Sequence, residues 1–185
     1  MYIENWFCTP ILYYDLEKEI LQEVQSQIEK VIPIIMKKDL SNPWSDNTQT
    51  SFKYEDFDIC DIHEYSLNKL NQVIIEASEK IFTERKLRIF QSWFNFSYKN
   101  NFQFDHRHVG EKSGPLSGVY YYKTNGEDGE IEFSTPVNFF PTFHGRVVRY
   151  KPKIGRLLLF PSWLLHKVHI NKTDNLRISI SFNLR

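Results

Sequence analysis

The sequence predicts a mainly β fold, an antiparallel sandwich or barrel that is braced by helices at its N-terminal end. Aromatic residues make up 16% of the 185 residues, and aromatic side chains favour strands. All seven glycines lie between Gly110 and Gly155, which concentrates the expected turns late in the chain. At about Arg88 the apolar spacing changes from a helical period to alternation. We therefore expect one domain, residues 1–185, with a helical support region at 1–87 and a β core at 88–185.

Two helices are expected in the support region. After Asp15, which we predict as the N-cap, apolar residues recur with helical spacing as far as Ile32, and Pro33 should end or kink this helix. A second helix is expected from about Ser66 to Phe82 on the same pattern. The stretch between them, residues 38–61, is polar and aromatic and is long for a plain loop, so we interpret it as a functional flap.

The β core begins with a long strand over residues 88–98, where aromatic and polar residues alternate. Further strands are expected at residues 116–123, 129–133, 146–150, 154–160, 164–170 and 175–184. The dipeptides Asn125-Gly126 and Asp128-Gly129 provide turn chemistry between two of them. Seven or so short strands after two helices are typical of an antiparallel sandwich or barrel.

The last strand alternates most regularly. Its apolar face is formed by Leu176, Ile178, Ile180, Phe182 and Leu184, and its polar face by Arg177, Ser179, Ser181 and Asn183. Two interpretations stay open at this point. The polar face is either solvated, as on many half-exposed strands, or it lines a polar pocket with Arg177 directed at an anion.

Composition excludes several classes of protein. A hydrophobic content of 41% is enough for a sizeable core and excludes disorder. The 23 basic and 23 acidic side chains cancel, so there is no clear signal for nucleic acid. No apolar run is long enough to span a bilayer, and residues 1–10 lack the basic region of a signal peptide. Cys8 and Cys60 stand far apart, and we interpret them as buried thiols of a cytoplasmic protein. The sequence gives no indication of oligomeric state.

Histidines are the main candidates for chemistry. In an extended segment, His106 and His108 point the same way, so both imidazoles can meet one metal ion. His166, which follows an apolar strand and a turn, is the best third ligand. Three imidazoles suit iron, zinc, copper or nickel and leave positions open for substrate and oxygen. A single His-x-His pair is equally compatible with surface or hydrogen-bonding residues. The weaker candidates are His63, His144 and His169, the last of which we expect to be structural.

The order of several motifs resembles the 2-oxoglutarate- and Fe(II)-dependent oxygenases, and most closely a prolyl-hydroxylase-like branch found in tailed phages and marine bacteria. The resemblance covers roughly residues 88–185. The motifs that carry it are, in order, Trp93-Phe94-Asn95, His106-Arg107-His108, Leu116-Ser117-Gly118-Val119-Tyr120-Tyr121, Gly129-Glu130-Ile131-Glu132-Phe133, Pro152-Lys153-Ile154-Gly155-Arg156-Leu157, Leu159-Phe160-Pro161-Ser162 with His166, and Arg177-Ile178-Ser179-Ile180-Ser181-Phe182-Asn183.

The resemblance implies a double-stranded β-helix, also called a jelly roll, which is a cupin-like fold with the metal in one mouth. His106, His108 and His166 would hold Fe(II). Most of the superfamily has His-x-Asp or His-x-Glu at the first pair, whereas His108 takes the carboxylate's place here. Three neutral imidazoles would leave the site one unit more positive, which strengthens its attraction for an anionic co-substrate.

The resemblance also implies a site for 2-oxoglutarate. Arg177 lies eleven positions after His166, where the family has the basic residue for the C5 carboxylate. A guanidinium suits this role because its planar fork donates two hydrogen bonds to a carboxylate. The further contacts expected for the co-substrate are Ser179, Tyr120 or Tyr122, and Asn95.

The implied reaction consumes 2-oxoglutarate and O2, releases succinate and CO2, and hydroxylates a prolyl residue or a small molecule. Residues 38–61 and 109–115 are expected to select the substrate. Two alternatives stay open: a three-histidine, cupin-like metalloenzyme that does not use 2-oxoglutarate, and a non-catalytic jelly-roll binding module. A phage-encoded enzyme of this kind would work in the host cytoplasm.

Overall fold

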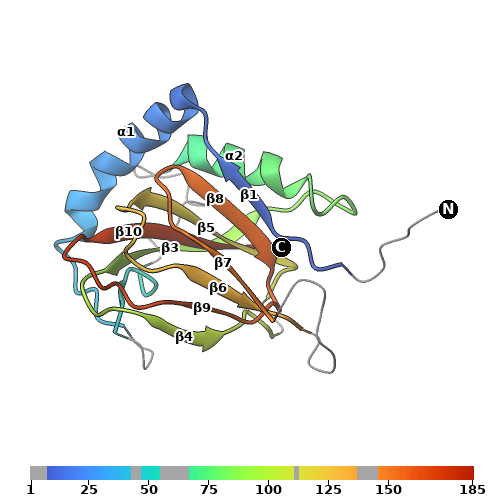
Figure 1. Ribbon diagram of the computed structural model, residues 1–185. Coiled ribbons are helices and arrows are strands. Elements are labelled where there is room, and N and C mark those ends of the chain that lie inside the picture. Colours follow the sequence, from blue (N-terminus) through green and yellow to red (C-terminus); the bar gives the residue numbers. More distant parts are fainter. Residues whose placement is uncertain (1–7, 43–46, 55–66, 111–112, 137–145) are drawn as a thin grey trace.

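The computed structural model describes residues 8–42, 47–54, 67–110, 113–136 and 146–185, which form two antiparallel sheets and two helices (Figure 1). The larger sheet, here called the major sheet, contains in spatial order β1 (Leu12–Asp15), β8 (Arg156–Pro161), β5 (Leu116–Lys123), β10 (Arg177–Leu184), β3 (Ile89–Ser97) and β2 (Gln49–Thr50). The minor sheet contains β4 (Gln103–His106), β9 (His166–Val168), β6 (Ile131–Ser134) and β7 (Val147–Tyr150). This arrangement confirms the predicted mainly β jelly roll.

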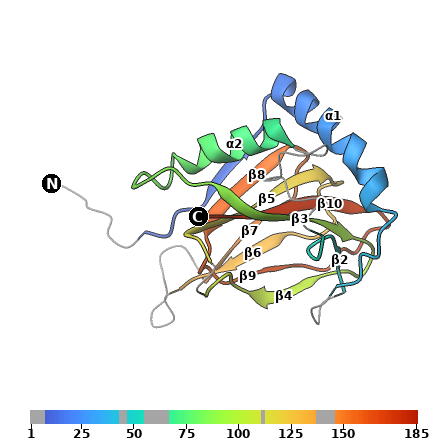
Figure 2. The ribbon, with the colours of Figure 1, turned by 180° about the vertical axis from the view of Figure 1, so that it is seen from behind.

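Both predicted helices are present, and they cover the outer face of the major sheet (Figures 1 and 2). The buried faces of α1 (Lys18–Ile35) and α2 (Asn68–Ser78) meet apolar side chains of β3, β8 and β10 in one core. Pro33 does not end α1, which runs on to Ile35. Pro33 has no N–H to donate to the carbonyl of Glu29, but it lies in the last turn, so the lost bond interrupts the helix only near its end.

Alternation along the strands divides the interior into two layers. Ile178, Ile180 and Phe182 of β10 face the helices. The residues that alternate with them along β10, among them Arg177 and Ser179, face the space between the two sheets, where they line a cavity. The polar face of the last strand is therefore buried rather than solvated, because the minor sheet covers it. A second apolar cluster, which includes Phe133 and Phe160, fills part of this inter-sheet space.

Asp15 is not the N-cap of α1. The N-cap residue is Glu17, which makes no capping hydrogen bond with its side chain. Asp15 ends β1 instead, where its carboxylate accepts hydrogen bonds from Arg156 Nε at 2.7 Å and Lys153 Nζ at 2.7 Å. The carboxylate therefore links the edge strand to the start of β8 and the loop before it, rather than capping a helix.

This ion pair predicts a pH dependence of stability. The hydrogen bond from Arg156 is the main reason that the pKa of Asp15 falls from 3.8 to about 2. Because the folded-state pKa lies below the unfolded value, the stabilisation is complete above about pH 4 and is lost as the pH falls toward 2. We expect Asp15→Asn to flatten the pH dependence of the urea midpoint between about pH 4 and about pH 2. An unchanged acid slope in this variant would contradict the assignment.

Two expectations from the first half of the chain need correction or fall outside the described residues. Cys8 is exposed rather than buried, because it precedes β1 and lies outside the core. Cys60 lies outside the described residues, as do 43–46 and 55–61 of the expected flap. Among the described helices, none is long and apolar enough to cross a membrane.

Candidate metal centre

A cavity of about 420 Å³ lies between the two sheets and is lined by residues of both. Its wall brings together His106, His108, His166, Arg177 and Ser179, which the sequence predicts as site residues. The polar face of β10 forms one side of the cavity, and the adjoining ends of β4 and β9 bring in the histidines.

The three histidines form one cluster. His106 ends β4 and His166 begins β9, and the two residues are paired directly across the antiparallel ladder. His108 follows two residues after His106, where its backbone N–H donates to the carbonyl of Ser162 at 2.8 Å. One ring nitrogen of each histidine lies within 4.8 Å of those of the other two. This spacing and donor set fit a single divalent metal ion of the kind that imidazole favours.

Hydrogen bonds fix which nitrogen of each ring faces the centre of the cluster. Nδ1 of His106 lies 2.7 Å from the carbonyl oxygen of Phe104, and Nδ1 of His166 lies 2.8 Å from that of Leu164. A carbonyl only accepts, so both Nδ1 atoms carry the proton. The lone pair is then on Nε2, which is the atom left to bind a metal.

Burial keeps the rings of His166 and His108 neutral. Together with the neighbouring His106, it lowers the pKa of His166 to about 3. Burial is also the main cause of the lowered pKa of His108. Neutral imidazole is the form that coordinates a metal, so near neutral pH no proton has to leave either ring before binding.

Asn183 is a site residue that the sequence analysis did not single out. Its Oδ1 accepts hydrogen bonds from Nδ1 of His108 at 2.6 Å and from Oγ of Ser117 at 2.7 Å, while its Nδ2 donates to Gln91. His108 is thereby oriented from the major sheet. The sequence signal for Asn183 is its position on the polar face of the last strand. Its contact with His108 depends on how β10 packs against the loop after β4, which no local pattern indicates.

We expect Asn183→Leu to weaken Fe(II) binding by about tenfold, because the ring of His108 loses its closer acceptor and keeps only the hydroxyl of Ser117, 3.0 Å from Nδ1. Fe(II) affinity measured anaerobically checks this. Asn183→Asp is the matched control, since a carboxylate still accepts from His108 and should preserve most of the affinity. Equal losses in the two variants would count against the proposed orientation.

Arg177 is a buried cation at the other side of this cavity, with an exposed fraction of 2%. Its Nη1 donates to the carbonyl oxygens of Asp128 at 2.9 Å and Gly129 at 2.7 Å. Its Nε is buried without a hydrogen-bond partner, and among the described residues no carboxylate forms an ion pair with it. Burial accordingly lowers the pKa of Arg177.

These features fit an anionic ligand. An unpaired guanidinium is unfavourable in a buried site, and a carboxylate that accepts from its free side would remove that penalty. Ser179, the next residue on the same face of β10, is buried and lines the same cavity. The described residues therefore place three imidazoles that could hold a metal ion and a guanidinium that could bind a carboxylate in one cavity.

The tyrosine assignment requires a correction. Tyr120 is fully buried in the core beneath the helices, and Tyr122 packs against that core, so both point away from the cavity. Tyr121 lines the cavity instead. Side chains alternate along β5. Val119 and Tyr121 face the minor sheet, so Tyr120 and Tyr122 face the helices. Burial raises the pKa of Tyr121 to about 12, so its phenol keeps the proton and can donate it.

Asn95 does not line the cavity. It lies on β3 opposite Ser179, is buried, and donates from Nδ2 to Oγ of Ser181 at 2.9 Å. It thus supports a residue of the wall rather than forming the wall. His169 lies 2.9 Å from Glu132 through Nε2, on the side of the minor sheet away from the cluster, while His63 and His144 lie outside the described residues.

Aromatic side chains form another part of the wall. Trp93 of β3 and Phe52, which follows β2, meet edge to face with ring centroids 5.1 Å apart. The Trp93 ring also lies 6.0 Å from that of His108. Phe52 belongs to the stretch interpreted as a flap, so at least this residue of the stretch contacts the cavity.

Comparison with known proteins supports a specific family. Residues 91–183 match a family model described as "Putative 2OG-Fe(II) oxygenase". The matched segment contains every member of the histidine cluster as well as Arg177. A search of curated proteins finds no significant match.

Several solved structures share the fold at low sequence identity. A prolyl-4-hydroxylase from Pseudomonas putida is 13% identical with a TM-score of 0.66, covering 96% of this chain and 91% of that one. HygX from Streptomyces hygroscopicus, solved with nickel and 2-oxoglutarate bound, is 12% identical with a TM-score of 0.63 and coverages of 95% and 82%. A prolyl hydroxylase from Trichoplax adhaerens, in complex with a hypoxia-inducible-factor peptide fragment, is 16% identical with a TM-score of 0.65 and coverages of 95% and 82%. With a family match over half of the sequence, a shared fold and a fitting cavity, this chain belongs to the 2-oxoglutarate- and Fe(II)-dependent oxygenases.

Proposed function

We propose that the protein is a dioxygenase that hydroxylates a carbon atom of a prolyl residue or a small molecule while 2-oxoglutarate is converted to succinate and CO2. One observation carries the proposal. The same inter-sheet cavity holds three imidazoles, each with a ring nitrogen within 4.8 Å of those of the other two, and a buried guanidinium whose Nε has no partner. A structural core has no need for this combination, whereas an iron and 2-oxoacid site requires both parts.

In this proposal His106, His108 and His166 hold the iron. Bound iron, with 2-oxoglutarate and O2, supplies the oxidising chemistry, and the protein supplies ligation, orientation and exclusion of water. The backbone acceptors of His106 and His166 and the amide of Asn183 keep the three rings oriented before the metal binds. This reduces the reorganisation needed on binding.

Three other side chains receive the far carboxylate of 2-oxoglutarate. Arg177 offers its free Nε side, Ser179 adds a hydroxyl, and the protonated Tyr121 adds a phenol. Burial around these groups strengthens the hydrogen bonds of a charged ligand. Asn95 acts indirectly through Ser181.

The rest of the cavity wall limits the substrate. Phe52 and Trp93 present aromatic surface, and Gln91 and Gln103 present neutral amides. Asp105 and Arg107 add one charge of each sign. Such a wall suits a group with both apolar and hydrogen-bonding parts, a description that fits a peptidyl proline or a small molecule. Structures of the same fold have been solved with a peptide fragment and with hygromycin B bound.

The proposal is tested by anaerobic titration. The metal-free protein is loaded with Fe(II), 2-oxoglutarate is added, and the visible spectrum is recorded. A metal-to-ligand charge-transfer band is expected, and succinate release in air should then require both additions. Iron binding without a band would favour the three-histidine metalloenzyme that does not use 2-oxoglutarate. Absence of iron binding would favour a binding module.

A further inference from the structure

We propose that a polar cluster at the end of the jelly roll next to Arg177, here called the loop lock, positions this arginine for the co-substrate. The inference rests on the proposed function of Arg177 as the carboxylate ligand. The loop lock joins the loop between β5 and β6 to the loop between β9 and β10, and its members are Thr124, Asn125, Asp128, Asn171, Thr173 and Asn175.

Asp128 connects the loop lock to Arg177. Its carboxylate is fully buried and accepts hydrogen bonds from the hydroxyl of Thr124, from the backbone N–H of Asn125 at 2.9 Å and from Nδ2 of Asn175 at 2.7 Å. Its backbone carbonyl, together with that of Gly129, holds Nη1 of Arg177. The carboxylate therefore fixes the turn, and the turn fixes the guanidinium.

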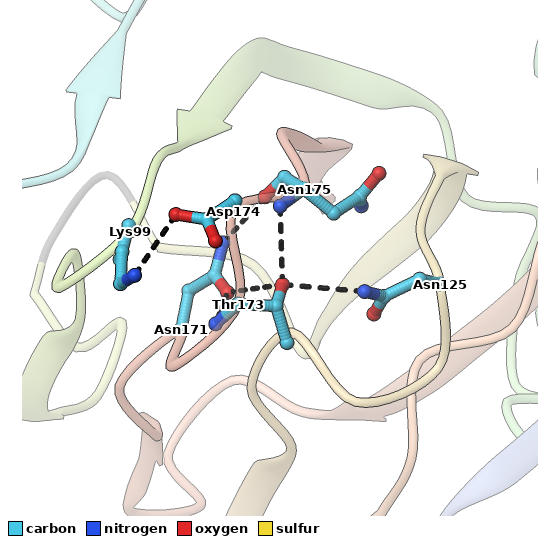
Figure 3. A network of polar contacts seen from close by, with 6 residues as sticks. All are labelled: Lys99, Asn125, Asn171, Thr173, Asp174 and Asn175. Carbon is cyan, nitrogen blue, oxygen red and sulfur yellow. Dashed lines mark hydrogen bonds and ion pairs between the residues drawn. The ribbon is translucent and has the colours of Figure 1, made fainter.

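The second loop is held from several directions, as Figure 3 shows. Asn171 is fully buried, and its Nδ2 donates to the carbonyls of Ser97 at 3.0 Å and Asn175 at 2.8 Å. Its Oδ1 accepts from the hydroxyl of Thr173 at 2.9 Å, and this hydroxyl accepts in turn from Nδ2 of Asn125 at 3.2 Å. Ser97 is the strand partner of Arg177, so the loop lock reaches the arginine from two sides.

Gly129 shows how closely the turn approaches the guanidinium. Its φ is +107°, and a Cβ at this position would lie 2.7 Å from Nη1 of Arg177 and 2.4 Å from the carbonyl oxygen of His169. Only glycine permits this conformation and this approach without a shift of the neighbours. The carbonyl acceptors are thus placed at one edge of the guanidinium, and the edge that carries Nε stays free.

The consequence is an arginine that is oriented before any ligand arrives. A free arginine side chain populates many rotamers, and ordering them upon binding weakens affinity. The loop lock removes that freedom in advance. Residues such as Asn175 and Thr173 therefore act as positioning residues: they reach the co-substrate only through Asp128 and Arg177.

Comparing the affinities of two ligands distinguishes a positioning role of the loop lock from a general effect on stability. We would measure dissociation constants of the Fe(II)-loaded protein, without oxygen, for 2-oxoglutarate and for 2-oxobutyrate, which has the same chelating end but no second carboxylate. Asn175→Ala should weaken 2-oxoglutarate binding by about fivefold to tenfold, a fraction of the loss of one charge-assisted hydrogen bond. It should leave 2-oxobutyrate binding and Fe(II) affinity unchanged.

The matched control lies in the same loop. Asp174 is exposed and pairs only with the surface residue Lys99 in the network of Figure 3, so Asp174→Asn should change neither dissociation constant. If Asn175→Ala does not fold, as judged from its thermal melt, Thr173→Val takes its place. Placed on an Arg177→Gln background, either variant should cause no further loss for 2-oxoglutarate.

The possible failures are distinguishable. If Arg177→Gln weakens 2-oxoglutarate selectively but Asn175→Ala and Thr173→Val do not, the loop lock has no positioning role and the proposed function stands. Equal loss of both ligands in the loop-lock variants would also overturn the inference, because it would indicate general destabilisation. If the unaltered protein binds 2-oxoglutarate no more tightly than 2-oxobutyrate, the proposed function of Arg177 itself is wrong.

Discussion

His166→Ala is expected to abolish both Fe(II) binding and succinate release. His166 is 4% exposed, is paired across the ladder with His106 and supplies one of the three imidazoles that the described residues bring to the cluster. Without it two ligands remain, too few for the three-point attachment that holds iron in oxygenases of this kind. Iron content after anaerobic loading and desalting gives the first measurement, and 2-oxoglutarate-dependent succinate release gives the second.

His169→Ala is the matched control for this experiment. It removes an imidazole three residues away that lies beside Glu132 rather than in the cluster, so iron content and turnover should persist. Some stability should be lost, since Glu132 gives up one of its hydrogen-bond donors. Full iron loading of the His166→Ala protein would show that the metal is bound elsewhere.

Arg177→Gln is expected to raise the 2-oxoglutarate concentration needed for half-maximal turnover. The change removes charge-assisted hydrogen bonds worth about 1.5–3 kcal/mol, which corresponds to a factor of about 10 to 150. Iron affinity should be unaffected, because the histidines bind through other strands. Succinate release measured against 2-oxoglutarate concentration, with iron saturating, checks this result.

Arg149→Gln is a suitable comparison. Arg149 is half exposed on β7, pairs with Glu132 and has no place in the cavity wall, so its loss removes the same charge without touching the site. A co-substrate requirement that is unchanged in Arg177→Gln, or raised equally in Arg149→Gln, would contradict the role given to Arg177.

The sequence predicted the fold because its signals there are local. Alternation identified the long strands, and helical spacing identified both helices. The strands that it missed are short: β1 and β4 have four residues each and β2 has two. β6 is equally short but was predicted, because the turn residues Asn125-Gly126 and Asp128-Gly129 precede it. The division of the chain into a helical region and a β core within one domain stays a prediction.

The site was predictable only in part, for the same reason. Strand geometry predicted that His106 and His108 point the same way, but it did not predict which tyrosine lines the cavity. Choosing Tyr121 over Tyr120 and Tyr122 requires knowing which face of β5 the helices cover, and that depends on tertiary packing. Asn183 and the loop lock depend on contacts between segments that are far apart in the chain, as in the hydrogen bond between Asn183 and His108, 75 positions apart. No local pattern encodes such contacts.

The two ends of the proposed 2-oxoglutarate site come from different sheets. His106 and His166 belong to the minor sheet, whereas Arg177 and Ser179 belong to the helix-backed major sheet. A ligand that binds the metal at one end and Arg177 at the other would link the two sheets. Amide hydrogens of β4 and β9 should then exchange more slowly when Fe(II) and 2-oxoglutarate are both bound than when either is bound alone. Iron and co-substrate would therefore also stabilise the packing of the two sheets.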